Sequence, residues 1–190
     1  MMTDGSLLTG YDLSRLNLLV VDDNKYMILL IKTLLHSIRI KNVREASDGA
    51  QAFTELRKFP ADMVVCDLQM RPLDGIEFTR LVRTAKDSPN QYVPIIMLTG
   101  HTEERLVKEA RDAGVNEFLS KPLSAAGLYS RMIEIIDNPR PFVRTPTYFG
   151  PDRRRKQVPF RGADRRKAAQ ADGADEGGLT PDKIEDLMKS

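Results

Sequence analysis

The sequence has no tryptophan, one cysteine and only 6% aromatic residues among its 190. Because a single cysteine cannot form an internal disulfide, the chain does not read as a small disulfide-stabilised secreted module. No apolar run approaches the roughly 20 residues that a membrane-spanning helix needs. Residues 1–17 also lack the basic region and apolar stretch of a secretory signal. Together these absences predict a cytoplasmic protein with no membrane span.

Charge is distributed unevenly along the chain, although the total is only +2. Residues 1–137 carry 17 basic and 19 acidic side chains, net −2. Residues 138–167 carry 10 basic and 2 acidic side chains, net +8, and residues 168–190 carry 2 basic and 6 acidic ones, net −4. Blocks of this kind are typical of tails and interaction segments rather than of a folded core.

Short apolar runs alternate with helical patterns in the first 137 residues. Four runs are those of buried strands, at 18–21, 63–66, 95–98 and 118–119, and residues 43–46 are a candidate for a fifth strand. Apolar residues at helical spacing follow each run, over 27–38, 49–58, 78–85, 103–113 and 128–136. A strand–helix unit repeated five times predicts an α/β fold with a doubly wound, five-stranded parallel sheet.

The composition divides the chain into four parts. We expect an N-terminal extension at 1–13 and the α/β domain at 14–137, which ends where Asn138-Pro139-Arg140-Pro141 breaks the last helix. Residues 138–178 are rich in Arg, Pro and Gly, and we expect an arginine-rich tail that is largely disordered. Residues 179–190 contain Thr180-Pro181-Asp182, which is typical of a helix start, so a short C-terminal helix is a candidate there.

Polar residues stand where the predicted strands end. They are Asp22, Asp23, Asp67, Thr99 and Lys121. Because the carboxyl ends of parallel strands form the site in open α/β sheets, we expect these side chains to converge. Carboxylate oxygens suit Mg²⁺, which relieves the repulsion among three carboxylates. One carboxylate then remains as a nucleophile that forms an acyl phosphate, with the ammonium and hydroxyl offsetting phosphate charge.

With these residues in view, the chain resembles the receiver domain of bacterial two-component response regulators. The matching segments are Val20-Val21-Asp22-Asp23-Asn24, Asp67-Leu68-Gln69-Met70 followed by Asp74-Gly75, Leu98-Thr99-Gly100 and Phe118-Leu119-Ser120-Lys121-Pro122. They occur in the family's order and spacing over about residues 14–137. The resemblance implies the flavodoxin-like receiver fold.

The resemblance also implies the acceptor and its metal site. Asp67 matches the residue that is phosphorylated in the family. Asp22 and Asp23 match the acidic pair that binds Mg²⁺ together with Asp67, and the backbone carbonyl of Gln69 matches a further ligand. The implied cofactor is therefore Mg²⁺.

Three further positions match residues that respond to the phosphoryl group. Lys121 matches the lysine that contacts phosphate, and its bond to Pro122 is cis in the family. Thr99 matches the switch hydroxyl, and Phe118 matches the aromatic ring whose rotamer follows it. One departure is visible: Arg71 stands where the family usually has proline.

These matches imply a single-domain response regulator, a phosphoprotein of phosphorelay signal transduction. Asp67 would take a phosphoryl group from a histidine kinase or phosphotransfer protein, and the chain would then change its affinity for a downstream target protein. It would not be an enzyme beyond its own phosphorylation and dephosphorylation. A phosphatase of the haloacid dehalogenase type needs an aspartate two residues after the nucleophile, where this chain has Gln69 after Asp67 and Asn24 after Asp22.

The basic segment contains an imperfect repeat, Gly-x-Asp-Arg-Arg, at 150–154 and again at 162–166. Arginine offers a planar fork for phosphate and guanine edges, and it stacks on rings. The segment resembles the arginine-rich extension of some receiver proteins that bind cyclic di-GMP, which gives an alternative function as a ligand-gated adaptor. The residues implied are Arg153, Arg154, Arg155, Arg165 and Arg166. An acidic protein surface and nonspecific nucleic acid remain alternatives, whereas no module for sequence-specific DNA binding is present.

Overall fold

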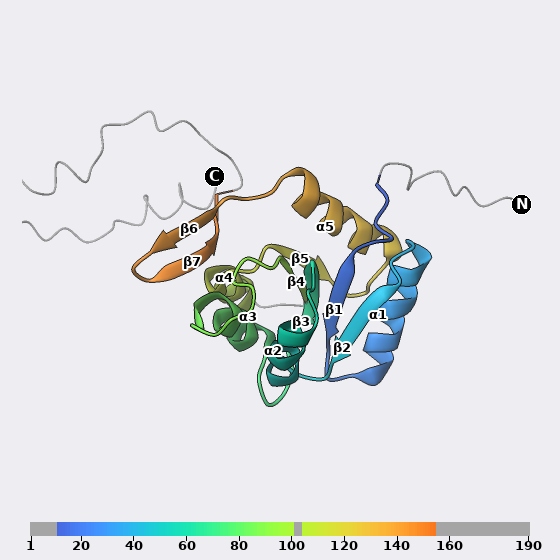
Figure 1. The fold of residues 1–190 in the computed structure, drawn as a ribbon, viewed down its shortest axis with the longest axis horizontal. Coiled ribbons are helices and arrows are strands. Elements are labelled where there is room, and N and C mark those ends of the chain that lie inside the picture. The colour runs from blue at the N-terminus through green and yellow to red at the C-terminus, as the bar shows by residue number, and fades with distance from the viewer. Residues whose placement is uncertain (1–10, 101–103, 155–190) are drawn as a thin grey trace, which may run out of the picture. The chain divides into compact units, whose positions relative to one another are not determined.

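The computed structural model describes residues 11–100 and 104–154, and a parallel sheet organises them (Figure 1). The strands are β1 (Asn17–Val21), β2 (Asn42–Ala46), β3 (Met63–Asp67), β4 (Ile95–Thr99) and β5 (Glu117–Ser120). Their order is β2-β1-β3-β4-β5, and every neighbouring pair is parallel. The order reverses direction after β1, so the predicted doubly wound sheet and flavodoxin-like receiver fold are confirmed.

A helix follows each of these strands. The helices are α1 (Lys25–Ser37), α2 (Gly49–Lys58), α3 (Gly75–Thr84), α4 (Glu104–Ala113) and α5 (Ala125–Asp137). A short polar side chain caps the start of four of them by accepting backbone N–H bonds. These caps are Asn24, Asp48, Asp74 and Ser124. The turns that follow the strands at the carboxyl edge therefore contain the polar residues that start these helices.

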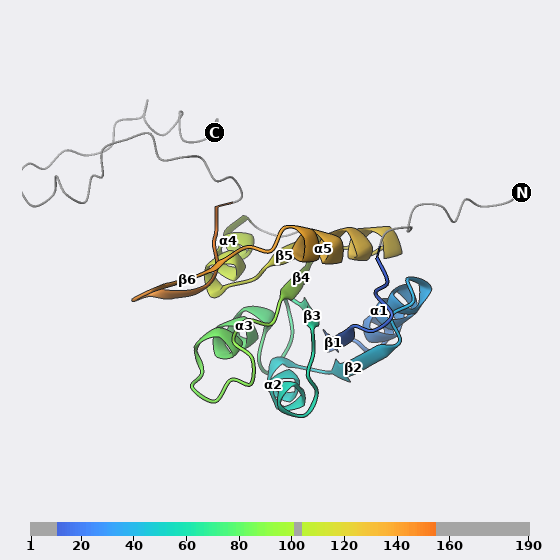
Figure 2. The same cartoon turned by 45° about the horizontal axis from the view of Figure 1, so that its top comes forward.

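Alternate residues of each strand point into two separate cores. Leu18 and Val20 of β1 pack with α1 and α5, whereas Leu19 and Val21 pack with α2, α3 and α4. Figure 2 shows α1 and α5 on one side of the strands, with α2 and α3 on the other. Because both faces of the sheet are covered, β3 and β4 are buried along their whole length, as their unbroken apolar sequences predict.

A β-hairpin follows α5, and the sequence analysis did not predict it. Strands β6 (Phe142–Thr145) and β7 (Tyr148–Pro151) pair in antiparallel register, Phe142 opposite Pro151. The expectation of largely irregular structure from residue 138 onward is therefore corrected for this stretch. The rings of Phe142 and Phe149 pack with Tyr92, with centroids 5.0–5.5 Å apart. This apolar contact stabilises a segment whose composition is otherwise typical of a tail.

The described residues begin at 11, slightly before the predicted start of the domain at 14. Leu13 is buried in the core beside α1, and the Tyr11 hydroxyl donates a hydrogen bond to the Asp137 carboxylate. Within the described ranges, no helix is both long and apolar enough to cross a bilayer. The candidate helix at 179–190 and most of the arginine-rich tail lie outside the described residues.

Candidate functional site

Two carboxylates and an ammonium meet where β1, β3 and β5 end. The Lys121 Nζ lies 2.9 Å from Asp67 Oδ1 and 3.7 Å from Asp22 Oδ2. Both carboxylates are buried, with Asp22 only 1% exposed and Asp67 7% exposed. Of the five side chains predicted to converge at the strand ends, these three therefore lie in contact. Asp67 remains slightly exposed to solvent.

The backbone around Lys121 and Asp67 fixes this geometry. The Lys121 N–H donates to the Thr99 carbonyl at 2.7 Å, so β4 and β5 stay paired up to the site. The Lys121-Pro122 bond is cis, as the resemblance implied, and Arg71-Pro72 is cis as well. A Cβ on Gly75 would lie 2.3 Å from the Asp67 carbonyl oxygen, so only glycine fits where α3 begins against β3. The Asp-Gly pair in the sequence carried that signal.

Asp22 is the site residue whose charged form is disfavoured by its surroundings. Burial raises the pKa of its carboxyl, and the nearby charge of Asp67 adds to the rise, while the N–H of Asn24 and the Lys121 ammonium oppose it. Among the described residues, Asp22 Oδ2 is the buried side-chain oxygen or nitrogen that has no hydrogen-bond partner. Such an orphaned oxygen is unusual in a native core. A hard divalent cation beside Asp22 and Asp67 would satisfy it, so the donor set fits Mg²⁺.

Asp23 and Gln69 are the exposed members of the implied metal set, and the charge of Asp23 is near enough to raise the pKa of Asp22 further. Both side chains are exposed, and both line a cavity of about 490 Å³ next to Arg71 and Asp74. Within residues 11–100 and 104–154, no three His, Cys, Asp or Glu side chains form a ready cluster for a metal ion. Successive residues leave a strand end on opposite sides, which explains why Asp23 does not follow Asp22 inward.

Thr99 and Phe118 stand on neighbouring strands. Thr99 is buried at the end of β4, opposite Ser120 in register, and Phe118 lies opposite Met97. The Phe118 ring is half-buried against the core formed by α2, α3 and α4. The hydroxyl and the ring therefore belong to the two strands that flank Lys121, as the sequence analysis expected.

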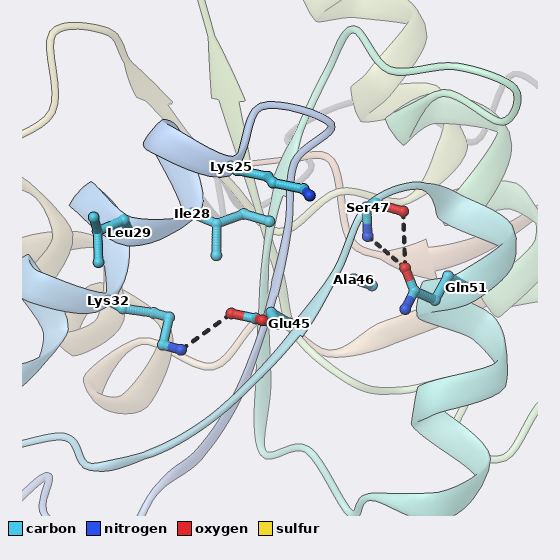
Figure 3. A pocket seen from close by; sticks show the side chains of 8 residues that line it. All are labelled: Lys25, Ile28, Leu29, Lys32, Glu45, Ala46, Ser47 and Gln51. Carbon is cyan, nitrogen blue, oxygen red and sulfur yellow. Dashed lines mark hydrogen bonds and ion pairs between the residues drawn. The ribbon is translucent and has the colours of Figure 1, made fainter.

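A second cavity, of about 440 Å³, opens between α1, β2 and α2 (Figure 3). Its polar rim holds an ion pair between Lys32 and Glu45 at 3.0 Å, and Ser47 donates to the Gln51 side chain. Leu29 lines the cavity and is 63% exposed. The sequence analysis assigned no role to these residues, because nothing in their spacing distinguishes them from ordinary helix surface.

Only two of the five arginines selected in the tail lie within the described residues. The Arg153 guanidinium lies 3.9 Å from the Tyr148 ring centroid, and its Nη1 pairs with Asp112 Oδ1 at 3.0 Å. Arg154 is exposed and its N–H donates to the Asp152 carboxylate. The remaining three, Arg155, Arg165 and Arg166, lie outside the described ranges.

The comparisons with known proteins agree with the fold. Residues 18–133 match the family model described as the response regulator receiver domain. The chemotaxis protein CheY-3 of Vibrio cholerae is 33% identical over 122 residues, which cover 64% of this chain and 92% of that protein. The chemotaxis protein CheY of Pseudomonas aeruginosa is also 33% identical over 122 residues, covering 64% and 97%.

Solved structures give the same result. CheY4 of Vibrio cholerae has a TM-score of 0.58 at 27% identity and covers 63% of this chain and 98% of that one. The receiver domain of a sensor histidine kinase from Pseudomonas aeruginosa, described with magnesium in its active-site cleft, has a TM-score of 0.55 at 30% identity, covering 63% and 94%. Since the family model spans well over half of the residues, the chain belongs to the response regulator receiver domain family of two-component signalling systems.

Proposed function

We propose that this chain is a single-domain response regulator that accepts a phosphoryl group on Asp67. The donor is a histidine kinase or a phosphotransfer protein, and the phosphorylated chain changes its affinity for a downstream target protein. The observation that carries the proposal is the pairing of one ammonium, Lys121, with the two buried carboxylates of Asp67 and Asp22. Family membership supports the general role in phosphoryl-acceptor signalling.

In the proposed reaction, an Asp67 carboxylate oxygen attacks the phosphorus of a phosphohistidine. The P–N bond breaks, its electron pair returns to the imidazole nitrogen, and that nitrogen takes a proton from solvent. The product is an acyl phosphate on Asp67. Hydrolysis is the attack of water on the same phosphorus, which releases inorganic phosphate and restores the carboxylate.

The other site residues position and neutralise charge in this scheme. Lys121 holds Asp67 before transfer and then neutralises the added phosphate charge, because its ammonium already lies 2.9 Å away. The Thr99 hydroxyl donates to a phosphoryl oxygen, and the Phe118 ring follows that movement. Asp22, Asp23, Asp67 and the Gln69 carbonyl would hold Mg²⁺, which supplies positive charge against the phosphoryl oxygens.

The direct test uses a small phosphodonor, such as phosphoramidate, with Mg²⁺ and the full chain. Intact mass should show one phosphoryl group on the wild type, and hydroxylamine should remove it, as it does from acyl phosphates. Asp67→Asn should show none, whereas Asp87→Asn, which changes an exposed carboxylate before β4, should label like the wild type. Labelling of Asp67→Asn at the wild-type level would end the proposal.

We also propose that the arginine-rich segment binds cyclic di-GMP, a second function that is compatible with phosphorylation of Asp67. The supporting observation is that two guanidinium groups in and directly after the hairpin lie over rings: Arg144 over Phe149 at 4.1 Å and Arg153 over Tyr148 at 3.9 Å. A guanidinium held this way offers its other face to a guanine base. Titration calorimetry should give heat with wild type and much less with Arg153→Ala/Arg154→Ala, and absence of heat with wild type would reject the ligand.

A further inference from the structure

The segment made of α4 and β5 connects the two edges of the sheet. At the carboxyl edge, α4 begins at Glu104, soon after Thr99, and β5 ends at Ser120, directly before Lys121. At the amino edge, α4 ends at Ala113 and β5 begins at Glu117. Any movement of this segment at the Asp67 edge must therefore be accommodated at the other edge, where the β6–β7 hairpin lies against it (Figure 1).

The hairpin meets the segment with backbone against backbone at two glycines. A Cβ on Gly150 of β7 would lie 2.9 Å from the Gly114 Cα and 2.6 Å from the Tyr148 hydroxyl of the same hairpin, and a Cβ on Gly114 would lie 3.3 Å from the Phe149 carbonyl oxygen. Gly114 also has a φ of +105°, which favours glycine. Two glycines thus allow the hairpin to seat directly on the turn between α4 and β5.

Two ion pairs fasten the same turn on either side. Arg153 pairs with Asp112, the penultimate residue of α4, at 3.0 Å. Arg140, which precedes β6, pairs at 3.5 Å with Glu117, the first residue of β5. Glu117 is buried and is also 3.6 Å from Arg131 of α5. The hairpin therefore holds the end of α4 and the start of β5 at once.

We infer that the β6–β7 hairpin is a clamp on the α4–β5 segment, and that its seating is coupled to the phosphorylation state of Asp67. The inference rests on the proposed function, because it concerns the state of that residue. With the hairpin seated, the Lys121 ammonium directly after β5 lies 2.9 Å from the Asp67 carboxylate, and a phosphoryl group on Asp67 would take over that contact and displace the end of β5. Loosening the clamp therefore favours the phosphorylated arrangement, and by linkage phosphorylation loosens the clamp.

The experiment measures the affinity of the full chain for beryllofluoride with Mg²⁺, a stable mimic of the aspartyl phosphate, by titration calorimetry. Gly150→Ala pushes the hairpin off the Gly114 backbone and should tighten binding about fivefold or more, the lower end of typical coupling between sites. Arg153→Ala removes an exposed ion pair and should tighten binding about twofold, in line with the small contribution of such pairs. The charge swap Asp112→Arg/Arg153→Asp should return the affinity toward wild type.

Two controls separate clamp loosening from a general change in charge or hairpin stability. Arg57→Ala removes the same charge from an exposed ion pair with Asp87, and should leave the affinity unchanged. Thr145→Ala removes a hydrogen bond to the Tyr148 carbonyl within the hairpin itself and should also leave it unchanged. As an independent readout, amide hydrogen exchange of residues 142–151 in the wild type should become faster when beryllofluoride binds.

The outcomes distinguish the inference from the function beneath it. If the wild type binds beryllofluoride but the clamp variants bind equally or more weakly, the clamp is rejected and the proposed function stands. If hairpin exchange is unchanged on binding, the clamp is likewise rejected. If the wild type does not bind at all, the proposed function fails and the inference falls with it. Should Gly150→Ala not fold, the surface variant Arg153→Ala and its charge swap decide the matter.

Discussion

Two buried charges, Asp22 and Arg83, lie at opposite edges of the same sheet, and their surroundings differ sharply. Arg83 is 1% exposed, and its guanidinium donates to the Gly114 and Gln91 carbonyls and to the Asn116 side chain at 2.9–3.1 Å. Asp22 is equally buried but keeps an oxygen with no hydrogen-bond partner among the described residues. The buried charge of Arg83 is fully hydrogen-bonded, whereas that of Asp22 is not.

The contrast gives a physical criterion for separating structural from functional buried charges. Burial lowers the pKa of Arg83 to about 10 and raises the pKa of Asp22, so both charges are disfavoured by desolvation. At Arg83 every nitrogen of the guanidinium has found an acceptor, and Phe142 lies over its plane at 5.2 Å. At Asp22 the missing partner is what a cation would supply.

The largest expected effect on stability comes from replacing Arg83, whose guanidinium is fully hydrogen-bonded. Arg83→Met takes the guanidinium donor from the Gly114 and Gln91 carbonyls and leaves Asn116 Oδ1 with the Ile95 N–H alone, and it should lower the free energy of unfolding by about 3 kcal/mol. Arg83→Lys keeps the charge but loses the planar fork, and it should lower it by about 2 kcal/mol. Urea denaturation followed by far-UV circular dichroism measures both. A loss below about 1 kcal/mol for the methionine variant would mean that water replaces the guanidinium at that edge.

The next largest effect comes from replacing Asp22, and it should stabilise the protein instead of destabilising it. Asp22→Asn removes a poorly compensated charge, so in EDTA it should raise the free energy of unfolding by about 1 kcal/mol. The same variant should lose the stabilisation that the wild type gains from Mg²⁺. Asp48→Asn is a matched control, because asparagine caps α2 as well as aspartate does. A destabilised Asp22→Asn variant in EDTA would contradict the comparison.

The pH dependence sharpens the comparison further. Because the folded pKa of Asp22 lies above its usual 3.8, the folded state binds this proton more tightly than the unfolded state does. Asp22 therefore contributes stability that is complete below the unfolded pKa and is lost as pH rises through the folded pKa. The advantage of Asp22→Asn in EDTA should be greatest at pH 7 and should vanish near pH 3.8. Paired denaturation series that diverge on acidification would rule this out.

The smallest expected effect on stability comes from an exposed ion pair between two helices. Arg80 and Glu109 join α3 to α4 across 2.9 Å, and both side chains are well exposed. Arg80→Ala should change the free energy of unfolding by less than about 0.5 kcal/mol, because water screens exposed pairs. The same denaturation measurement serves, and an effect as large as that of Arg83→Met would show that burial is not what separates these arginines.

The sequence predicted the sheet well because its local signals agree with its tertiary structure. Runs such as Met63–Cys66 are apolar throughout because both faces of β3 are covered, and Asp67 follows where the strand leaves the core. Asp22, Asp67 and Lys121 could be found because parallel strands bring their carboxyl ends to one edge. That Asp23 is exposed while Asp22 is buried depends on side-chain direction, which spacing alone does not give.

Long-range contacts account for what was missed. Arg83 reaches partners 31 and 33 residues away, and nothing local marks it as the buried arginine among many exposed ones. The hairpin was concealed by a composition rich in Arg, Pro and Gly, although the apolar pairs Phe142-Val143 and Tyr148-Phe149 flanking a turn are a recognisable hairpin signal. Its stability depends on Tyr92, which lies some fifty residues earlier in the chain.

The one cysteine of the chain, Cys66, lies fully enclosed in the central strand, immediately before Asp67. Burial raises the pKa of its thiol well above the usual value, so the thiolate, which is the form that attacks a disulfide reagent, is scarce in the native protein. Thiol labelling can proceed only through molecules in which β3 has opened. The rate at which Cys66 is labelled in the natural chain therefore reports the rate at which β3 opens, and no second thiol contributes to the signal.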